Sequence, residues 1–152
     1  MILQHYLEVI SFVERLHRHF LEVVKIELDS LQIHDINSVQ ALILFNIGDQ
    51  EVSIGELTER GFYLGSNVSY NLKKLVDMGY IRYKRSETDR RSVRVSLSEK
   101  GLAASGVVRK LYQRQLGSVE QVGQIMCDDF KALNKALVRL ERFWSDQIRY
   151  QL

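Results

Sequence analysis

The spacing of apolar residues changes at Gly79, and this change constrains the fold more than any other feature of the sequence. Before Gly79, four apolar residues recur at helical spacing: Val68, Leu72, Leu75 and Val76. After it, apolar residues alternate with polar ones, as in a strand with one buried face: Val93, Val95 and Leu97. Glycine is also well suited to the left-handed turn that ends a helix. The sequence therefore predicts a helix followed directly by a hairpin, whose first strand is 80–83.

Hydrogen-bonding and basic groups lie on or beside the face opposite the apolar stripe of this helix: Ser66, Asn67, Tyr70, Lys73 and Lys74. Ser66 is placed to cap the N-terminus of the helix. A merely solvated helix face more often mixes glutamate with lysine, whereas this face carries few negative charges. The composition favours contact with bases or phosphates, and the alternative is an ordinary solvated surface.

Positive charge is concentrated in the same segment. Residues 64–100 contain nine basic and four acidic side chains, a local charge of +5, although the whole chain carries only +2. The hairpin tip, from Lys84 to Arg91, is rich in cations and too polar to pack. A local basic surface of this kind suits a polyphosphate partner.

The rest of the chain is expected to be mainly helical, because proline is absent and the nine glycines mostly separate helical stretches. Apolar spacing and capping residues predict five further helices, which begin near Tyr6, Asn37, Ser53, Ser98 and Cys127. Gln40 and Glu56 complete capping boxes at the second and third of these helices. A short edge strand is expected at 51–52. The first helix is predicted to reach about residue 30 and the last about residue 150.

The first and last helices both carry wide apolar seams. The last one presents its apolar residues at a spacing typical of coiled coils: Phe130, Leu133, Leu137, Leu140 and Trp144. A small monomer would have difficulty covering two such seams, so we expect a homodimer built from the termini. The alternative is that the two seams cover each other within one chain.

The composition suits a soluble protein. With 152 residues, 45% of them apolar, the chain can form one compact domain or a small domain with a helical extension. Charges interrupt every apolar run before the roughly 18 residues that a membrane span needs. His5 and Glu8 stand where a secretory signal would be basic and then apolar, so we expect a cytoplasmic protein. The single cysteine, Cys127, excludes an intramolecular disulfide.

The order of these elements resembles the MarR family of winged helix-turn-helix transcriptional regulators over nearly the whole chain. The most specific part is Asp89, Arg90 and Arg91, followed by a strand and a capped helix that starts at 99–101, which resembles the family's wing signature. The resemblance implies a mainly α fold with a small β wing. It implies a winged helix-turn-helix domain at 36–101 and a helical dimerisation region formed by 1–35 and 102–152.

The function implied by this resemblance is that of a bacterial transcriptional regulator, expected to be a repressor. It would bind a palindromic double-stranded DNA operator as a homodimer, without a cofactor or metal. Residues 66–74 match the recognition helix, which is expected in the major groove. Asn67 and Asn71 carry the donor and acceptor pair that suits adenine, although Asn71 could instead form an intramolecular hydrogen bond. Ser69 and Tyr70 are expected at phosphate or a thymine methyl group.

The wing assignments also follow from the resemblance. Arg91 matches the arginine that enters the minor groove, Asp89 matches the acid that orients it, and Arg90 is expected at phosphate. The alternative is that Asp89 is a turn residue and Arg91 a solvated cation. The full expected DNA-binding set is Ser66, Asn67, Ser69, Tyr70, Asn71, Lys73, Lys74, Arg85, Asp89, Arg90 and Arg91. The bulky turn at 62–64 and the tyrosine at position 70 depart from the common family pattern and indicate a divergent subgroup.

Members of this family commonly bind small effectors in a crevice between the dimerising helices and the winged domain. The residues expected to line it here are His17, Phe20, Phe45 and Tyr112. Such a crevice would take a small aromatic or anionic effector that releases the DNA. The alternative is that aromatic residues at helical spacing belong to the core.

Two other classes of function compete with DNA binding. A winged-helix module used for protein contacts would expose aromatic or aliphatic groups on the outer face of its helix. An enzyme would need a catalytic pattern, and the sequence has no Ser/His/Asp order, no phosphate-binding glycine-rich loop and no cluster with metal-ligand spacing. We therefore do not expect an enzyme.

Overall fold

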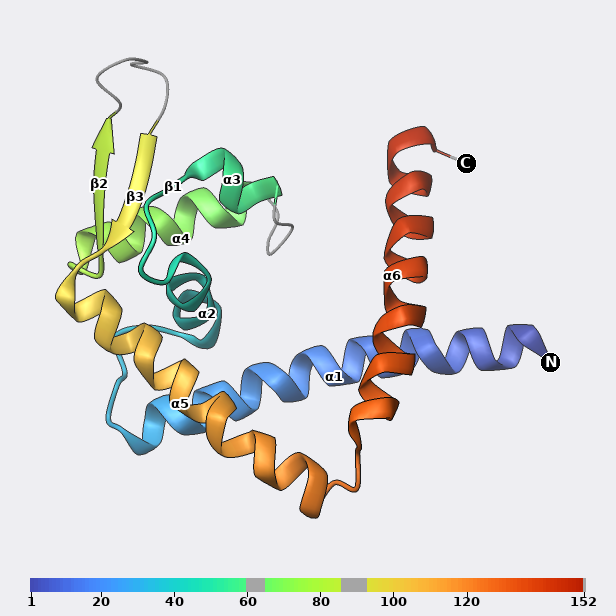
Figure 1. Ribbon diagram of the computed structural model, residues 1–152. Helices are drawn as coiled ribbons and strands as arrows, with labels where there is room; N and C mark the ends of the chain where they lie inside the picture. The colour runs from blue at the N-terminus through green and yellow to red at the C-terminus, as the bar shows by residue number, and fades with distance from the viewer. Residues whose placement is uncertain (60–64, 86–92, 152) are drawn as a thin grey trace. The chain divides into compact units, whose positions relative to one another are not determined.

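The computed structural model describes residues 1–59, 65–85 and 93–151, and the chain divides into two compact units, Met1–Leu111 and Tyr112–Leu152. In chain order the elements are α1 (Ile2–Ser30), α2 (Ser38–Ile47), β1 (Val52–Ser53), α3 (Ile54–Glu59), α4 (Gly65–Asp77), β2 (Ile81–Arg85), β3 (Val93–Leu97), α5 (Glu99–Gln121) and α6 (Cys127–Tyr150). Helices predominate and a small sheet lies beside them, so the predicted fold class is confirmed (Figure 1).

The sheet has three antiparallel strands in the order β1-β3-β2. The β2–β3 hairpin pairs Ile81 with Leu97 and Tyr83 with Val95, and the short edge strand β1 pairs Val52 with Val95. The edge strand lies one residue later than the sequence indicated. Figure 1 shows the hairpin extending beyond the helices, with α4 and α3 beside its base.

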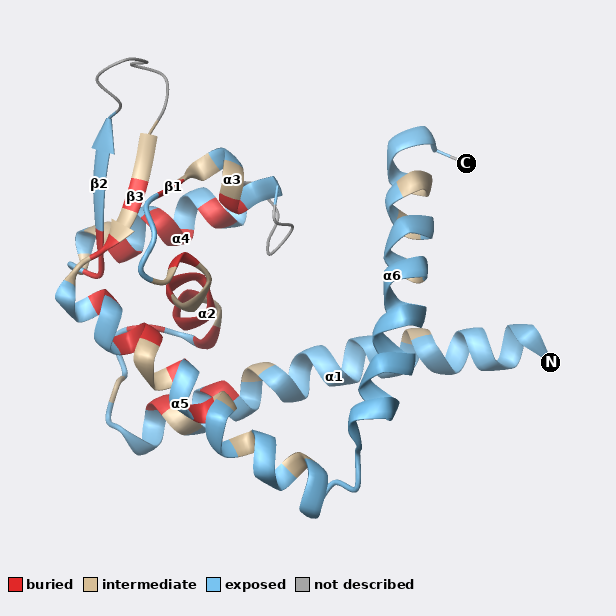
Figure 2. Cartoon of the chain, viewed as in Figure 1, coloured by how far each residue is buried: buried red, intermediate tan, exposed pale blue. Residues whose placement is uncertain are grey.

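Helix α2 is the centre of the core in the first unit. Most of its apolar residues are almost completely buried: Ala41, Leu42, Ile43, Leu44 and Ile47. Helices α1 and α4 contribute buried residues to the same unit: Val24 and Leu28 from α1, and Val68, Leu72 and Leu75 from α4. Each fully buried leucine or isoleucine contributes roughly 2 kcal/mol. Figure 2 shows buried residues along α2 and on one side of α4.

The helix caps largely follow the prediction. Asn37 and Gln40 form a complete capping box, with side-chain to backbone distances of 2.8 and 3.0 Å. Ser53 Oγ accepts a hydrogen bond from Glu56 N at 3.0 Å, and Ser98 Oγ accepts one from Gly101 N at 3.2 Å. Helix α4 begins at Gly65, one residue before the predicted cap at Ser66.

The turn between α4 and β2 explains why the period changes at Gly79. Gly79 has φ +82°, its N–H donates to the Val76 carbonyl at 3.0 Å, and the next N–H donates to Leu75 at 2.9 Å. These two bonds form a Schellman motif, which ends a helix and satisfies its last carbonyl groups. The chain therefore leaves α4 in a fixed direction and enters β2 within two residues.

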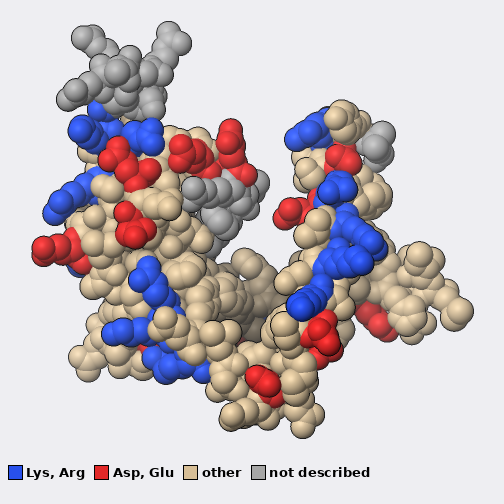
Figure 3. Space-filling model, in the orientation of Figure 1, with Lys and Arg blue, Asp and Glu red and all other residues tan. Residues whose placement is uncertain are grey.

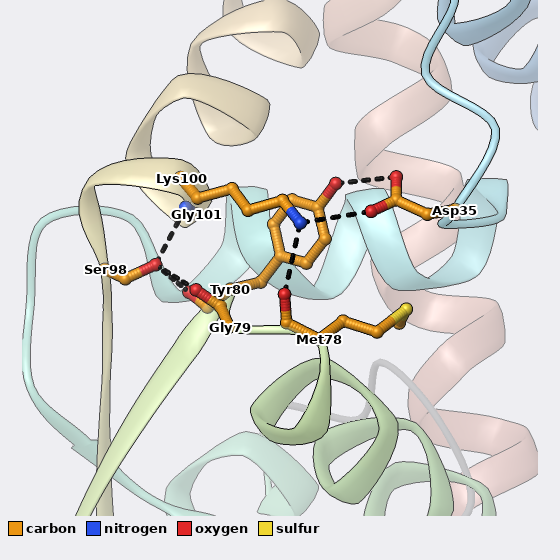
Figure 4. Close-up of polar contacts among 7 residues, drawn as sticks. All are labelled: Asp35, Met78, Gly79, Tyr80, Ser98, Lys100 and Gly101. Atoms are coloured by element: carbon orange, nitrogen blue, oxygen red, sulfur yellow. Dashed lines mark hydrogen bonds and ion pairs between the residues drawn. The ribbon is translucent and has the colours of Figure 1, made fainter.

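A polar junction joins the base of the hairpin to the α1–α2 loop and the start of α5 (Figure 4). The Tyr80 hydroxyl donates to Asp35 Oδ1 at 2.8 Å, and Lys100 Nζ donates to Asp35 Oδ2 at 3.2 Å and to the Met78 carbonyl at 3.1 Å. Lys100 Nζ also lies 4.3 Å from the centroid of the Tyr80 ring, a cation–π contact. Three segments distant in sequence therefore meet at one phenol.

Candidate nucleic-acid interface

Helix α4 separates an apolar face from a polar one. Val68, Leu72 and Leu75 are at most 4% exposed. The exposed residues on the rest of the helix include five of the expected DNA-contacting residues: Asn67, Ser69, Tyr70, Lys73 and Lys74. Tyr70 is 62% exposed, and Lys74 Nζ lies 5.8 Å from its ring centroid. The first turn has no acidic residue, so the exposed surface offers hydrogen-bond donors and positive charge.

Asn71 does not belong to this outer face. Its side chain is only 8% exposed, its Nδ2 donates to the Asn67 carbonyl at 2.9 Å, and its Oδ1 accepts from Gln40 Nε2 at 3.3 Å. The structure therefore corrects the expected contact with adenine in favour of the intramolecular alternative. The reason lies in the helical period, because position 71 is three residues after Val68 and four before Leu75 and so falls on the side of the apolar stripe.

The strand register reveals a basic surface that the expected DNA-binding set did not include. Lys84 pairs directly with Arg94, and Arg82 pairs with Ser96. Side chains alternate across a sheet, so these three cations lie on one face, opposite the face of the buried Ile81, Val95 and Leu97. We call Arg82, Lys84 and Arg94 the outer basic face. The alternation of cations with apolar residues indicates a shared face within each strand, and the register then places the cations of both strands together.

The outer basic face is partly neutralised by one carboxylate. Arg94 Nε lies 3.2 Å from Glu51 Oε1, just before β1, and both side chains remain substantially exposed. Arg85 lies at the end of β2, on the face of Tyr83, and is exposed. Figure 3 shows lysine and arginine side chains gathered on the hairpin below its grey tip.

A groove of about 400 Å³ lies between α4 and the hairpin. Its lining combines residues from both with one residue of α3: Ile54, Ser69, Leu72, Lys73, Val76, Asp77, Tyr83, Val93 and Val95. The groove brings Ser69 and Lys73 of α4 next to the exposed Tyr83 of β2. The outer part of α4 and the hairpin therefore form one continuous surface.

Several predicted residues lie outside the residues that the structure describes. These are the wing-tip residues Asp89, Arg90 and Arg91 and the bulky turn at 62–64. The side chain of Ser66 is likewise outside the description, although its backbone belongs to α4.

The four residues expected to line an effector crevice do not line the large pocket of the first unit. This pocket has a volume of about 670 Å³ and is lined by the second half of α1 and by residues 33–40. His17 and Phe20 are exposed on α1, and Phe45 is partly buried on α2. Tyr112 belongs to the second unit, and burial raises the pKa of its hydroxyl.

Within the described ranges, no three histidine, cysteine, aspartate or glutamate side chains form a group that could hold a metal ion. No helix in the same ranges is both long enough and apolar enough to cross a membrane. Cys127 is a free, exposed thiol at the start of α6.

Known proteins are similar to this chain in sequence and in fold. A family described as a winged helix DNA-binding domain matches residues 36–101. The exopolysaccharide II synthesis transcriptional activator ExpG of Rhizobium meliloti (strain 1021) is 40% identical over 148 residues, which cover 95% of this chain and 74% of ExpG. A MarR transcriptional regulator from Methanosarcina mazei Go1 superposes with a TM-score of 0.71 at 21% identity, over 90% of this chain and 96% of that one. The chain belongs to the MarR family.

A second structure shows the same fold in a complex. FabT of Streptococcus pneumoniae, solved in complex with DNA, superposes with a TM-score of 0.73 at 20% identity, over 93% of this chain and 98% of FabT. As a MarR-family protein, the chain is a DNA-binding transcriptional regulator and not an enzyme.

Proposed function

We propose that this MarR-family protein binds a palindromic operator as a homodimer, with α4 of each protomer in the major groove and the hairpin at the adjacent minor groove. The observation that carries the proposal is the exposed face of α4, which presents Asn67, Ser69, Tyr70, Lys73 and Lys74 beside the cationic hairpin. A helix that lies in the major groove needs donors and acceptors for base edges and cations for phosphates.

The proposed roles divide between base and backbone contacts. Asn67 has the donor and acceptor pair for adenine, and Tyr70 can reach a thymine methyl group or a phosphate. Lys73, Lys74 and Arg85 supply phosphate contacts. Arg91 would enter the minor groove, with Asp89 orienting it and Arg90 at phosphate; these three assignments rest on the family resemblance. Asn71 is left out because it is buried.

Homodimerisation is supported by the apolar surface of the terminal helices. None of the residues of α6 is buried, and its seam includes Phe130, Leu133 and Leu137, each at least 40% exposed. In α1, exposed apolar residues include Leu3, Leu7, Phe12 and Leu16. Exposed apolar surface of this extent marks an interaction site, and a two-fold dimer would bury the same patch on both chains. A dimer also supplies two α4 helices for the two halves of a palindrome.

Whether the protein activates or represses transcription is proposed from its similarity to ExpG. ExpG is named as a transcriptional activator, and it is 40% identical over 95% of this chain. We therefore propose activation for this chain, in place of the repression expected from its sequence. A reporter placed behind a genomic site bound by the protein tests this proposal, because deletion of the gene should lower the reporter signal. Release by a small aromatic or anionic effector remains a proposal carried by the family resemblance alone.

The central experiment measures DNA binding directly. Sites selected from genomic DNA should bind in fluorescence anisotropy with an affinity that falls steeply with salt, because lysine and arginine contacts displace counterions. Arg91→Ala should weaken binding at least tenfold while the dimer persists. Lys110→Ala, at an exposed position of α5, should not weaken binding. A salt slope near zero would reject DNA binding in favour of a protein-contact module. Normal binding by Arg91→Ala would instead reject only the wing assignment.

A further inference from the structure

A buried amide pair connects α2 to the recognition helix α4. Gln40 and Asn71 are 7% and 8% exposed, and Gln40 Nε2 donates to Asn71 Oδ1 at 3.3 Å. The remaining polar atoms of both side chains are also used. Gln40 Oε1 accepts from Asn37 N at 3.0 Å, and Asn71 Nδ2 donates to the Asn67 carbonyl at 2.9 Å. The bonds therefore run without a break from the cap of α2 to the first turns of α4.

The surroundings of this pair make its geometry demanding. Ala41 follows Gln40 and Leu72 follows Asn71, and both are at most 4% exposed, as is Leu75 one turn later. Apolar faces alone can pack in several neighbouring registers at similar free energy. A buried amide that loses its partner is strongly unfavourable, so an amide pair is satisfied in only one placement of the two helices. Buried polar groups are known to fix helix register at a cost in stability.

We propose that the Gln40–Asn71 pair sets the rotation and axial position of the recognition helix, and that Gln40 is thereby a positioning residue for sequence discrimination. The effect reaches DNA through Asn67, whose carbonyl is held by Asn71 and whose side chain is the proposed contact to adenine. The inference rests on the proposed DNA contacts of α4. It assigns a role to two buried residues that are not among the proposed DNA contacts.

The electrostatics of DNA binding are independent of this pair. Lys73, Lys74 and the outer basic face would attract phosphates even if α4 rotated by a small angle, because phosphate contacts tolerate small shifts in position. Base contacts tolerate far less, since each depends on the direction of a hydrogen bond at a base edge. Loss of the pair should therefore reduce discrimination and leave non-specific binding almost unchanged.

The test is a double replacement, Gln40→Leu with Asn71→Leu, which puts apolar side chains in place of both amides and leaves neither amide unpaired. Removing both partners of a buried hydrogen bond is often nearly neutral for stability. Because Gln40→Leu also removes the acceptor of the Asn37 N–H, we expect the variant to unfold modestly below the wild-type midpoint. It should bind random-sequence duplex with wild-type affinity. The ratio of operator to random-sequence affinity should fall about tenfold, comparable to the loss of one base contact.

A matched control separates positioning from stability. Asn37→Ala removes the cap acceptor of α2 but leaves the Gln40–Asn71 bond, so it should lower the unfolding midpoint and retain the wild-type affinity ratio. Should the double variant fail to fold, Asn71→Ala is the second variant. It removes one of the two amides and introduces the residue with the highest helix propensity, and it must show the same fall in the affinity ratio.

The outcomes distinguish this inference from the function on which it rests. A wild-type protein that binds operator and random DNA equally would reject the proposed sequence-specific function. A wild-type protein that discriminates, together with a folded double variant or Asn71→Ala that discriminates equally well, would overturn the positioning role. An affinity ratio that fell equally in Asn37→Ala would also overturn it, because the loss would then follow stability alone.

Discussion

The hydroxyl of Tyr80 donates a hydrogen bond to Asp35, 45 residues earlier in the chain, with 2.8 Å between the oxygens. Burial, followed by the hydrogen bond to Asp35 and the charge of Asp35, raises the pKa of Tyr80 above its ordinary value of 10.0. Burial also raises the pKa of Asp35, but the hydrogen bonds from Tyr80 and Lys100 and the charge of Lys100 outweigh it, so the net pKa is lowered. The charge states of the two residues therefore support each other across the base of the hairpin.

Tyr80→Phe removes this bond and keeps the ring. We expect the free energy of unfolding to fall by about 1 kcal/mol, the usual net value of such a hydrogen bond, because Asp35 remains partly solvated. Urea denaturation followed by circular dichroism measures the change. Tyr83→Phe serves as the control because the Tyr83 side chain is 55% exposed. Equal effects in the two variants would contradict the assigned role of the Tyr80 hydroxyl.

Asp35 should also make stability depend on pH. Its folded pKa lies below the ordinary value of 3.8, so its contribution is fully present above that value and is lost as pH falls through the lowered pKa. The stability difference between wild type and Asp35→Asn should therefore be constant from pH 7 to 5 and shrink below pH 4. Urea midpoints measured for both proteins across this range provide the test. If the stability difference between the two proteins grew as the pH fell, the lowered pKa of Asp35 would be contradicted.

Gly101→Ala should destabilise the fold by roughly 1–3 kcal/mol, because an added Cβ would overlap the backbone carbonyl oxygen of Tyr80 and press on Leu97. Gly106→Ala is the matched control on the same helix. A Cβ at that position meets nothing within 4 Å, and alanine favours a helix by about 1 kcal/mol over glycine. Thermal unfolding should move in opposite directions for the two variants. A shift in the same direction would refute the close approach.

The outer basic face should contribute to DNA affinity through phosphates. We expect Lys84→Gln to weaken binding to all duplexes and to reduce the slope of log affinity against log salt by about 1, the value for one phosphate contact. Stability should not fall, since Lys84 lies directly across from Arg94 and like charges in that position repel. Lys110→Gln, exposed on α5, controls for net charge. If the salt slope of Lys84→Gln equalled that of the wild type, the outer basic face would not contact DNA phosphates.

The apolar seam of α6 should hold the proposed dimer together. Leu137→Glu places a charge in the seam, so sedimentation equilibrium should show at least a tenfold rise in the dimer dissociation constant, the effect of burying an unpaired charge. Lys135→Glu is the control: it changes the net charge by more than Leu137→Glu does, but Lys135 lies on the opposite side of the helix from the seam. It should leave the dimer intact. If Leu137→Glu left the dimer unaffected, the seam would instead be assigned to contacts within one chain.

Sequence reasoning predicted well where a single local rule decides the structure. The capping residues Asn37, Ser53 and Ser98 and the left-handed Gly79 were recognisable because each satisfies backbone groups within a few positions. The fold class followed from the order of such signals. A cap at Ser66 would start the helix two residues later than the observed Gly65, an error of the size that is common at helix ends.

Contacts between residues that are distant in the sequence were harder to predict. The residue type of Asn71 suits adenine and an internal amide bond equally, and only the placement of Gln40 beside it decides between them. The outer basic face also needed the register that pairs Lys84 with Arg94, because alternation alone does not say which strands face each other. Such contacts depend on how separate elements pack.

The division of α4 into a buried and an exposed face has a consequence for how such regulators diverge. Val68, Leu72 and Leu75 are enclosed, whereas Asn67, Ser69 and Tyr70 contribute little to the interior. Substitutions at the exposed positions can therefore accumulate without endangering the fold. A duplicated gene could acquire a new target site through a few such changes, while the sequence of α2, enclosed along most of its length, would remain under strict selection.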